Sequence, residues 1–409
     1  MAKEYKDLVV GLDIGTAKVM AVVAEVMPGG ELKLAGLGIA PSNGLKRGVV
    51  VNIDATVQSI QMALKEAELM ADCKITRVYT GITGSHIRGI NSSGMVAVKD
   101  REVTQADVAR VVETAKAINI STDQRLLLVE PQEFIIDGQD VKEPIGMSGI
   151  RLEAKVHIVT GAQSAAENII KCVRRCGLEV EQLMLNPLAS SLSVLTEDER
   201  ELGVALIDIG AGTTDVAIFT NGAIRHTAVI PIAGDLITSD IAMALRTPTK
   251  DAEDIKVENG NAKQLLADPE IQVEVPGLGD RGPRMLSRQA LAGVIEPRIE
   301  EIFSLVHQVM RESGFEELLS SGIVLTGGSS VMPGMVELGE DIFLKPVRRG
   351  IPKYSGALAD MVAQPRAATV MGLLEEARVA RMRGLKVAQK NGSVKTALSQ
   401  VKDWFVGNF

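Results

Sequence analysis

Two segments of the chain place an aspartate at the end of an apolar run and follow it with glycine and threonine. They read VGLDIGTAKVMAVV over residues 10–23 and ALIDIGAGTTDVAIF over residues 205–219. The apolar runs on both sides of each Asp-Ile-Gly predict two strands joined by a tight turn. Glycine lets the backbone approach an anion closely, so that neighbouring N–H groups can bind phosphate. Each segment is therefore a candidate phosphate-binding loop.

A carboxylate that lies against phosphate needs a cation between the two groups. Mg²⁺ suits this position, because it binds one or two carboxylates together with phosphates and waters. Asp13 and Asp208 are the candidate ligands. Two such hairpins facing each other would hold one polyphosphate from both sides. Either segment alone is weak support, since glycine-rich hairpins also occur for purely structural reasons.

A third glycine-rich segment lies further along the chain. It reads IVLTGGSSVMPGM over residues 323–335 and predicts a strand that ends in Gly327-Gly328-Ser329 before a helix. Three such segments together favour a nucleotide site built from all of them over three isolated structural turns.

The composition limits the class of protein. The chain has 409 residues, of which 46% are hydrophobic, 23% charged and 3% aromatic, with 39 glycines. This length allows two or more lobes with aliphatic cores, which fits an α/β fold. Three cysteines and four histidines argue against a disulfide framework or a Cys/His metal site. No apolar run reaches the roughly 18 residues of a spanning helix, and no signal sequence is recognisable, so a cytosolic protein is expected.

The C-terminal segment differs from the rest of the chain. The net charge is −8, yet residues 378–409 contain seven Lys or Arg residues and one Asp, so a basic tail follows an acidic body. A helix over residues 394–409 would place its apolar side chains on one face. These are Val394, Ala397, Leu398, Val401, Trp404, Phe405 and Phe409. The pattern predicts an amphipathic helix among the headgroups of an anionic membrane, and the alternative is a terminal helix that packs on the body.

The segment between the two hairpins has a pattern of its own. Residues 84–160 predict a strand at GMVAVKD, a helix that begins at Thr104 with Asp107 in a capping box, a strand pair around RLLLVEPQEFIID and a strand at RLEAKVHIVT. This pattern indicates an inserted small α+β subdomain. Further along, a helix over residues 287–313 is expected to be bent or restarted at Pro297.

The order of these elements resembles the actin, Hsp70 and sugar-kinase superfamily from residue 8 to about residue 377. Within it, the chain is similar to the FtsA family of actin-like bacterial cell-division proteins. The similarity rests on the strings VVGLDIGTAKV, EAELMADCKI, LASSLSVLTEDERELGV, DIGAGTTDVAIFTNGAIRHT, VIPIAGDLITSDIA, VIEPR and GIVLTGG. Most of these strings are long and specific, and they are spread along the chain from residue 9 to residue 328.

The resemblance implies an α/β fold of two duplicated, actin-like (ribonuclease H-like) lobes. An inserted α+β subdomain, 1C, takes the place of subdomain 1B of actin, and an amphipathic helix ends the chain. The implied boundaries are residues 1–83 and 161–190 for subdomain 1A, 84–160 for 1C, 191–234 and 301–378 for 2A, 235–300 for 2B, 379–393 for a linker and 394–409 for the membrane-targeting helix.

The resemblance also implies which residues bind ATP and Mg²⁺. The first phosphate loop consists of Asp13, Gly15, Thr16, Ala17 and Lys18, and the second of Asp208, Gly210, Ala211, Gly212, Thr213, Thr214 and Asp215. The adenosine side consists of Gly234, Glu253, Lys256, Gly327, Gly328 and Ser329. Asp13 and Asp208 would bind Mg²⁺. For Glu253 and Lys256, the alternative is an ordinary i, i+3 ion pair on a helix surface.

Binding of ATP does not imply efficient hydrolysis. Actin-like hydrolases place a Glu or Gln where this chain has Asn186, in the string NPLASS over residues 186–191. An Asn side chain is a poor general base, so the usual gain of roughly 10²–10⁴-fold from such catalysis is expected to be missing. The sequence therefore predicts tight Mg-ATP binding with, at most, weak Mg-dependent ATPase activity.

The resemblance further implies a self-assembling protein that carries FtsZ, the tubulin-like division protein, to the membrane. The FtsZ tail would bind 2B, where Arg284 and Arg298 could meet an acidic peptide, although both could equally be ordinary surface arginines. Other division proteins would bind 1C, and the C-terminal helix would bind anionic lipid. The expected location is the cytoplasmic face of the cell inner membrane at the division site, as a peripheral protein. No nucleic-acid partner is expected.

Two other functions fit the same fold. A sugar or acetate kinase would need a catalytic Asp in a substrate cleft between the lobes. A pilus-assembly actin relative would bind an inner-membrane partner through a similar inserted subdomain. Neither accounts for the amphipathic C-terminal segment, which favours the cell-division function.

Overall fold

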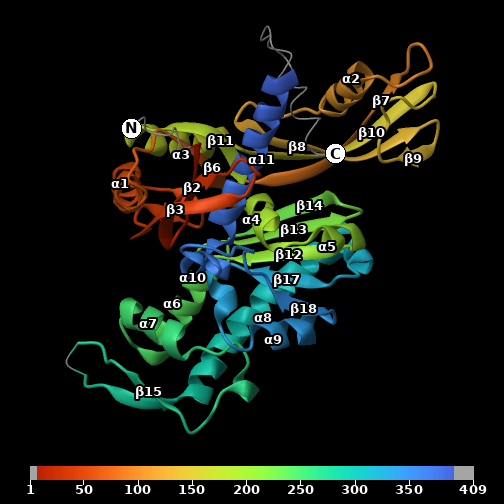
Figure 1. Cartoon of the computed structure of the whole chain (residues 1–409). Coiled ribbons are helices and arrows are strands. Elements are labelled where there is room, and N and C mark those ends of the chain that lie inside the picture. The colour runs from red at the N-terminus through yellow and green to blue at the C-terminus, as the bar shows by residue number, and fades with distance from the viewer. Residues whose placement is uncertain (1–6, 280, 391–409) are drawn as a thin grey trace.

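The computed structural model describes residues 7–279 and 281–390. Figure 1 shows two lobes stacked along the length of the molecule, with a smaller subdomain projecting from each. The predicted amphipathic helix over residues 394–409 lies outside the described residues.

The two lobes contain sheets of the same topology. The strand order is β11-β6-β1-β2-β3 in the first lobe and β14-β13-β12-β17-β18 in the second. In each sheet, β1 or β12 pairs antiparallel with the next strand and parallel with a later one. The duplication and both hairpins are therefore confirmed. The strands are β1 (Leu8–Ile14), β2 (Lys18–Val26), β3 (Leu32–Pro41), β6 (Arg77–Ile82), β11 (Glu179–Leu185), β12 (Val204–Ile209), β13 (Thr214–Thr220), β14 (Ala223–Ile230), β17 (Ile323–Thr326) and β18 (Val347–Arg349).

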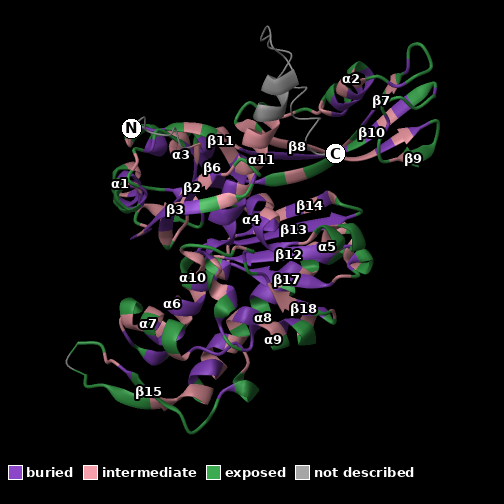
Figure 2. Cartoon of the chain, viewed as in Figure 1, coloured by how far each residue is buried: buried purple, intermediate pink, exposed green. Residues whose placement is uncertain are grey.

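Helices cover both faces of the first sheet. One face packs against α1 (Ile53–Ala71) and α3 (Gln163–Arg175), and the other against α4 (Asn186–Val194) and α11 (Ala368–Lys390). A sheet covered on both faces buries every residue of its central strands, which is why these strands read as continuous apolar runs. Figure 2 shows the central strands of both lobes as mainly buried. Each fully buried Val, Leu or Ile contributes about 1.5–3 kcal/mol.

α4 and α11 also join the cores of the two lobes. The end of α4 and the start of α11 pack against the second sheet, through Val194 and Ala368. The two helices approach so closely that a Cβ on Gly372 would lie 1.7 Å from the carbonyl oxygen of Ala189. Glycine is therefore required at position 372, because any side chain there would push the helices apart.

The inserted subdomain contains a four-stranded antiparallel sheet of order β7-β10-β8-β9, covered by α2. α2 begins after Thr104, which forms the predicted capping box with Asp107. The predicted strand pair around RLLLVEPQEFIID is wrong, because this string lies in one long strand that tolerates two irregularities in its pairing with β10. The elements are β7 (Arg88–Ala97), α2 (Gln105–Ala115), β8 (Gln124–Ile136), β9 (Gln139–Val141) and β10 (Arg151–Ala162).

The subdomain below the second lobe consists of helices and one hairpin. α8 runs without interruption through Pro297, so the predicted restart at that residue does not occur. α6, α8 and α9 pack against the second sheet. The elements are α6 (Gly234–Leu245), α7 (Thr249–Asn259), β15 (Gln272–Val275), β16 (Arg284–Ser287), α8 (Arg288–Ser313) and α9 (Met335–Phe343).

The predicted linker over residues 379–393 differs from the structure, because α11 continues through it as far as Lys390. Arg378 and Arg381 hold this part of the helix to the first lobe through the Gly30 carbonyl oxygen and the Asp7 carboxylate. Within residues 7–279 and 281–390, no helix is long and apolar enough to cross a membrane. The remaining elements are β4 (Leu45–Lys46), β5 (Val49–Val50), α5 (Glu197–Leu202), α10 (Ala359–Val362) and 3-10 turns at Gln264–Leu266, Glu316–Leu318, Gly328–Val331 and Pro365–Ala367.

Candidate functional site

A cavity of about 450 Å³ lies where the two lobes meet. It collects all the predicted nucleotide-binding residues except Thr214 and Gly234. The predicted residues that line it are Asp13, Gly15, Thr16, Ala17, Lys18, Asp208, Gly210, Ala211, Gly212, Thr213, Asp215, Glu253, Lys256, Gly327, Gly328 and Ser329. The two hairpins and the third glycine-rich segment, which are far apart in the sequence, thus lie at one site.

The first hairpin contributes a carboxylate and an amine. The backbone N–H of Gly15 donates to the Lys18 carbonyl oxygen at 2.9 Å and closes the turn between β1 and β2. The Lys18 Nζ atom lies 3.6 Å from an Asp13 carboxylate oxygen and donates to the Arg366 carbonyl oxygen at 2.6 Å. Burial raises the pKa of Asp13 and lowers the pKa of Lys18. Both groups are therefore poorly solvated. A bound cation would stabilise the Asp13 carboxylate, and a bound anion would stabilise the Lys18 ammonium group.

The second hairpin repeats the same turn. The Gly210 N–H donates to the Thr213 carbonyl oxygen at 2.9 Å. The Asp208 Oδ2 atom accepts a hydrogen bond from the Ser190 hydroxyl at 2.5 Å. Burial, reinforced by the nearby Asp13 charge, raises the pKa of Asp208 to about 6. A second carboxylate thus faces the same cavity in an environment that disfavours its charge unless a cation binds.

Close glycine contacts bring the two hairpins together. A Cβ on Gly212 would lie 2.5 Å from the Thr16 hydroxyl, and the Thr16 hydroxyl in turn accepts from the Gly48 N–H at 3.1 Å. A Cβ on Gly327, which has a φ of +87°, would lie 2.3 Å from Asp208 Oδ1. Side chains at Gly212 and Gly327 would fill the space between the loops, so glycine keeps that space open for a ligand.

A hydrogen bond crosses from one lobe to the other beside these loops. The Thr83 hydroxyl donates to Asp215 Oδ1 at 2.6 Å. Burial is the main reason that the pKa of Asp215 rises to about 8, and the charge of Asp208 adds to it. Without a ligand, Asp215 therefore holds its proton near neutral pH.

The raised pKa of Asp215 makes stability depend on pH. The unfolded chain releases this proton near pH 3.8, while the folded chain keeps it to about pH 8, so folding becomes less favourable across this interval. Asn at this position can still accept from Thr83 and has no proton to lose. We expect Asp215→Asn to raise the free energy of unfolding of the ligand-free protein at pH 8 by at least about 2 kcal/mol, with little effect at pH 4. Denaturant unfolding at both pH values measures this, and an equal effect at both would contradict it.

The second lobe supplies the other end of the cavity. The Lys256 Nζ atom donates to Glu253 Oε2 at 2.7 Å, the Thr238 hydroxyl at 2.8 Å and the Gly234 carbonyl oxygen at 3.2 Å. Apolar lining comes from Val257, Met332 and Pro333. Glu253 and Lys256 do form the i, i+3 pair that the sequence left open, and the pair also lines the cavity.

Thr214 and Gly234 do not line the cavity. Thr214 is the first residue of β13, and its hydroxyl donates away from the loops, to the Ile232 carbonyl oxygen at 2.7 Å. Successive strand residues point to opposite faces, so Asp215 turns toward the cavity while Thr214 turns away from it. Gly234 contacts a lining residue from behind the cavity wall, since its N–H donates to the Gly210 carbonyl oxygen at 3.2 Å.

Several lining residues were missed in the sequence. Among them are Gly48, Thr83, Val257, Met332, Pro333, Gln364, Arg366 and Thr369. Thr83 had a usable signal, because it directly follows β6, which pairs parallel with β1. The carboxyl ends of neighbouring parallel strands meet at one sheet edge, so Thr83 had to lie near Asp13. The others lie on loops and helix starts whose approach depends on tertiary packing.

Asn186 lines the cavity at the start of α4. Its Oδ1 atom is buried without a hydrogen-bond partner and packs against Gly81, where a Cβ would lie 2.1 Å from it. An unpaired buried amide oxygen is unfavourable. The neutral Asn186 side chain thus lies at the cavity wall and offers no general base there.

The residues of the cavity fit Mg²⁺ and a nucleotide. Among the described residues, no group of three or more His, Cys, Asp and Glu side chains could hold a metal ion. Mg²⁺ does not require such a group, because it is usually held by one or two carboxylates together with phosphates and waters. Burial raises the pKa of both Asp13 and Asp208, and a cation bound between them would offset this cost of burying charge.

The two arginines predicted to bind a partner lie apart from this cavity. The Arg298 guanidinium already contacts Asp240, with its Nε 2.6 Å from Asp240 Oδ2, and also contacts Glu301. An acidic peptide would therefore have to displace both carboxylates. Arg284 is exposed and contacts the Leu245 carbonyl oxygen, so it is the more available of the two.

Comparison with protein families identifies two regions of the chain. The family described as "Cell division protein FtsA" matches residues 205–372, and "SHS2 domain inserted in FTSA" matches residues 84–160. The cell division protein FtsA of Pseudomonas aeruginosa is 55% identical over 98% of each chain. The protein of that name from Escherichia coli K12 is 45% identical over 99% of each chain.

Solved structures show the same fold at lower identity. The PilM–PilN type IV pilus biogenesis complex gives a TM-score of 0.64 at 18% identity, over 90% of this chain and 98% of that one. MreB5 of Spiroplasma citri bound to ADP gives 0.57 at 16%, over 94% and 99%, and the MamK double helical filament gives 0.53 at 12%, over 90% and 98%. These likenesses confirm the actin-like α/β fold. Both family models match parts of the chain, and relatives at 55% and 45% identity cover 98% and 99% of it, so the chain belongs to the FtsA family of cell division proteins.

Proposed function

We propose that the chain binds Mg-ATP in the cavity between its lobes. The observation that supports this most directly is the convergence of both aspartate hairpins on one cavity. Asp13 and Asp208 would hold the ion, and the N–H groups and hydroxyls of the two turns would hold the phosphates. Bound Mg²⁺ would supply positive charge against the phosphates, and Lys18 would add a second positive charge.

The other end of the cavity suits a nucleoside. Glu253 and Lys256 offer polar groups for the ribose hydroxyls, while Val257, Met332 and Pro333 offer apolar surface for the base. Lys256 is tied to Glu253 and Thr238, so its ammonium group is held in place before the ligand arrives. Preorganised polar groups lose less conformational freedom on binding.

The same cavity is suited to hold ATP more than to hydrolyse it. Asn186 cannot take a proton from an attacking water, and Asp208, which would hold Mg²⁺, already accepts a hydrogen bond from Ser190. Binding energy would then stabilise one arrangement of the two lobes for as long as ATP remains intact. Slow turnover suits a protein whose assembly depends on that arrangement.

We further propose that the protein self-assembles and tethers FtsZ to the cytoplasmic face of the membrane. Membership of the FtsA family of cell division proteins supports a role in division, and the sequence of residues 394–409 supports an interfacial helix. Six large apolar side chains in one tail give on the order of 6–9 kcal/mol before ordering costs are deducted. One tail therefore binds reversibly, and several tails on one filament bind much more firmly through effective concentration. Recruitment of other division proteins through the inserted subdomain belongs to the same proposal.

Vesicle co-sedimentation tests this tethering. We expect FtsZ to pellet with anionic vesicles only when the full chain is present. Trp404→Glu places a charge on the apolar face of the tail and should reduce pelleting of both proteins at least tenfold. Trp404→Phe keeps the apolar character and serves as the matched control. Unchanged pelleting of the Trp404→Glu variant would contradict membrane binding by the tail.

The two rival functions receive less support. The likeness to the pilus complex rests on 18% identity and shows the fold alone, whereas relatives at 45–55% identity are named as cell division proteins. A sugar kinase would show ATP consumption that rises with sugar. We expect no such rise with this chain.

A further inference from the structure

The inserted subdomain (residues 84–160) joins the first lobe through two adjacent crossings of the chain. One crossing is at Gly84, whose φ is +139°, and the other is at Gly161. His86 lies between them, since its Nδ1 accepts from the Ala162 N–H at 3.2 Å and lies 3.1 Å from a Cβ built on Gly161. Gly84 lies in the loop after β6, whereas Gly161 lies within β10, opposite Arg125 of β8. The two crossings therefore form a short connection between the inserted subdomain and the first lobe.

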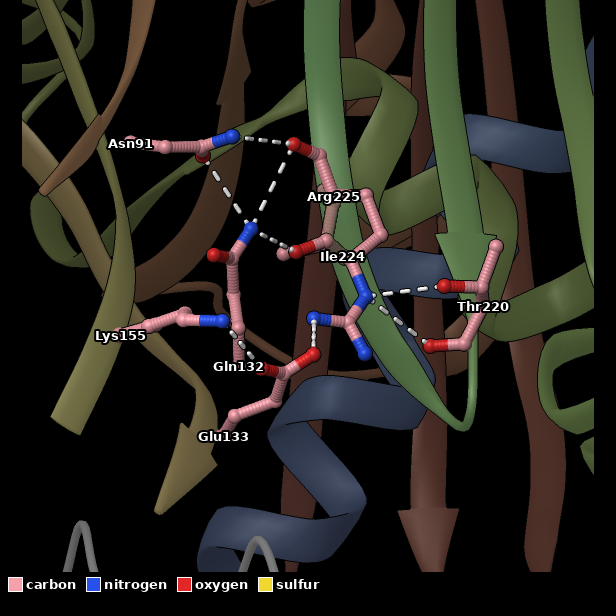
Figure 3. A network of polar contacts seen from close by, with 7 residues as sticks. All are labelled: Asn91, Gln132, Glu133, Lys155, Thr220, Ile224 and Arg225. Atoms are coloured by element: carbon pink, nitrogen blue, oxygen red, sulfur yellow. Dashed lines mark hydrogen bonds and ion pairs between the residues drawn. The ribbon is translucent and has the colours of Figure 1, made fainter. Parts of the chain in front are cut away.

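The inserted subdomain also contacts the second lobe, and this contact is here called docking. Figure 3 shows the contact between β7, β8 and β10 of the inserted subdomain and the β13–β14 hairpin of the second lobe. The Gln132 Nε2 atom donates to the Ile224 carbonyl oxygen at 2.8 Å, and Asn91 Nδ2 donates to the Arg225 carbonyl oxygen at 3.1 Å. These side chains satisfy backbone groups of the edge strand β14.

A charge pair lies within the same contact. The Arg225 Nη1 atom donates to Glu133 Oε1 at 2.6 Å, and Lys155 contacts the other carboxylate oxygen of Glu133 at 2.9 Å. Arg225 is only 4% exposed, so its charge depends on Glu133 and on the Thr220 hydroxyl and carbonyl oxygens. Removal of one member of a buried pair costs much more than an exposed pair contributes.

Next to the charge pair, the two bodies pack at van der Waals distance. A Cβ on Gly89 would lie 2.6 Å from the Thr227 hydroxyl. His157 contacts that hydroxyl through Nε2 at 2.9 Å and Asn91 Oδ1 through Nδ1 at 2.7 Å. The docked surface therefore follows β14, and a cavity of about 540 Å³ lies beside it, lined in part by Gln132, Glu133 and Arg225.

The docked strand is directly linked to the cavity. β14 pairs with β13, in which Asp215 is opposite Val229. Thr83, which binds Asp215 across the cavity, is the residue before the Gly84 crossing. The inserted subdomain thus contacts both lobes. Its connection to the first lobe begins directly after Thr83, and the strand on which it docks, β14, is the neighbour of β13, which carries Asp215.

We propose that docking of the inserted subdomain on β14 holds the two lobes in the arrangement that closes the cavity, so that docking and nucleotide binding stabilise each other. This inference rests on the proposed binding of nucleotide, and it makes docking of the inserted subdomain a regulator of that binding. A lobe rotation that opened the cavity would have to separate the subdomain from β14 or bend the chain at Gly84 and Gly161. Coupling of this kind is reciprocal, so a partner that undocks the subdomain would release nucleotide.

The test uses variants of the full chain that weaken docking without touching the cavity. Glu133→Arg puts a cation against Arg225 and Lys155, and Gln132→Ala removes the donor to the Ile224 carbonyl oxygen as a milder change. Arg151→Ala removes an exposed ion pair with Glu153 within β10 and serves as the control. Hydrogen exchange of the β14 amides measures docking, and a fluorescent ATP analogue with Mg²⁺ measures affinity.

We expect Glu133→Arg to speed exchange in β14 and to raise the dissociation constant of the analogue at least fivefold, the lower end of typical coupling. Gln132→Ala should shift both in the same direction by less, which keeps the test valid if Glu133→Arg does not fold. In the unaltered chain, the analogue should slow exchange in β14. Faster exchange with a dissociation constant unchanged within twofold would overturn the coupling. Failure of the unaltered chain to bind the analogue would instead overturn the proposed nucleotide binding.

Discussion

Gly212→Val should abolish nucleotide binding. A Cβ at this position would lie 2.5 Å from the Thr16 hydroxyl and 2.9 Å from the Arg47 Cα, and Val adds two methyl groups beyond it. Because both neighbours belong to the first lobe, the side chain would force the two phosphate loops apart. We expect the dissociation constant for Mg-ATP, measured by titration calorimetry, to rise at least about 100-fold, which corresponds to roughly 2.7 kcal/mol.

The matched control for this substitution is Gly29→Val. Gly29 lies in the turn between β2 and β3, and a Cβ there meets nothing within 4 Å. This variant should bind Mg-ATP as the unaltered chain does. If Gly212→Val retained affinity within threefold while remaining folded by circular dichroism, ATP would not be bound between the two loops.

Asn186→Glu should increase ATP turnover. Asn186 already lines the cavity, and its amide cannot accept a proton from water. A carboxylate at this position could orient and deprotonate the attacking water, a contribution of roughly 10²–10⁴-fold in enzymes. Since the introduced group would not be perfectly placed, we expect an increase of at least about tenfold in the rate of phosphate release.

Asn186→Gln provides the control, because Gln has the length of Glu without its charge. It should leave phosphate release near the rate of the unaltered chain. Both variants should bind Mg-ATP. A rate that failed to rise in Asn186→Glu, with binding intact, would show that position 186 does not limit hydrolysis.

The two hairpins could be predicted because their signal is local. Apolar runs on either side of Asp13 and Asp208 fix the strands, and glycine fixes the turns. The cavity that joins them could be predicted only through the family resemblance, since nothing in the spacing of residues 13 and 208 requires them to meet. Packing of α4 and α11 between the sheets brings them together, through contacts such as Gly372 against Ala189.

The differences between the sequence predictions and the structure have equally specific causes. Thr214 shares a string with true lining residues, but strand alternation turns its hydroxyl to Ile232. Residues 379–390 lack a clear apolar period, yet they continue α11 because Arg378 and Arg381 anchor that helix to the first lobe. Docking of the inserted subdomain on β14 left no sequence signal, because Glu133 and Arg225 are ordinary charged residues until the fold brings them together.

We propose above that the chain holds Mg-ATP between its lobes and hydrolyses it slowly. A single-turnover experiment tests this directly, with excess purified full chain, ATP labelled on the γ-phosphate, and Mg²⁺. Separation of bound from free nucleotide, followed by separation of ATP from phosphate, reports binding and hydrolysis in one sample. We expect most of the label to be bound and to remain as intact ATP after several minutes. Absence of bound label, or rapid Mg-dependent release of phosphate that Asp208→Ala abolishes, would contradict it.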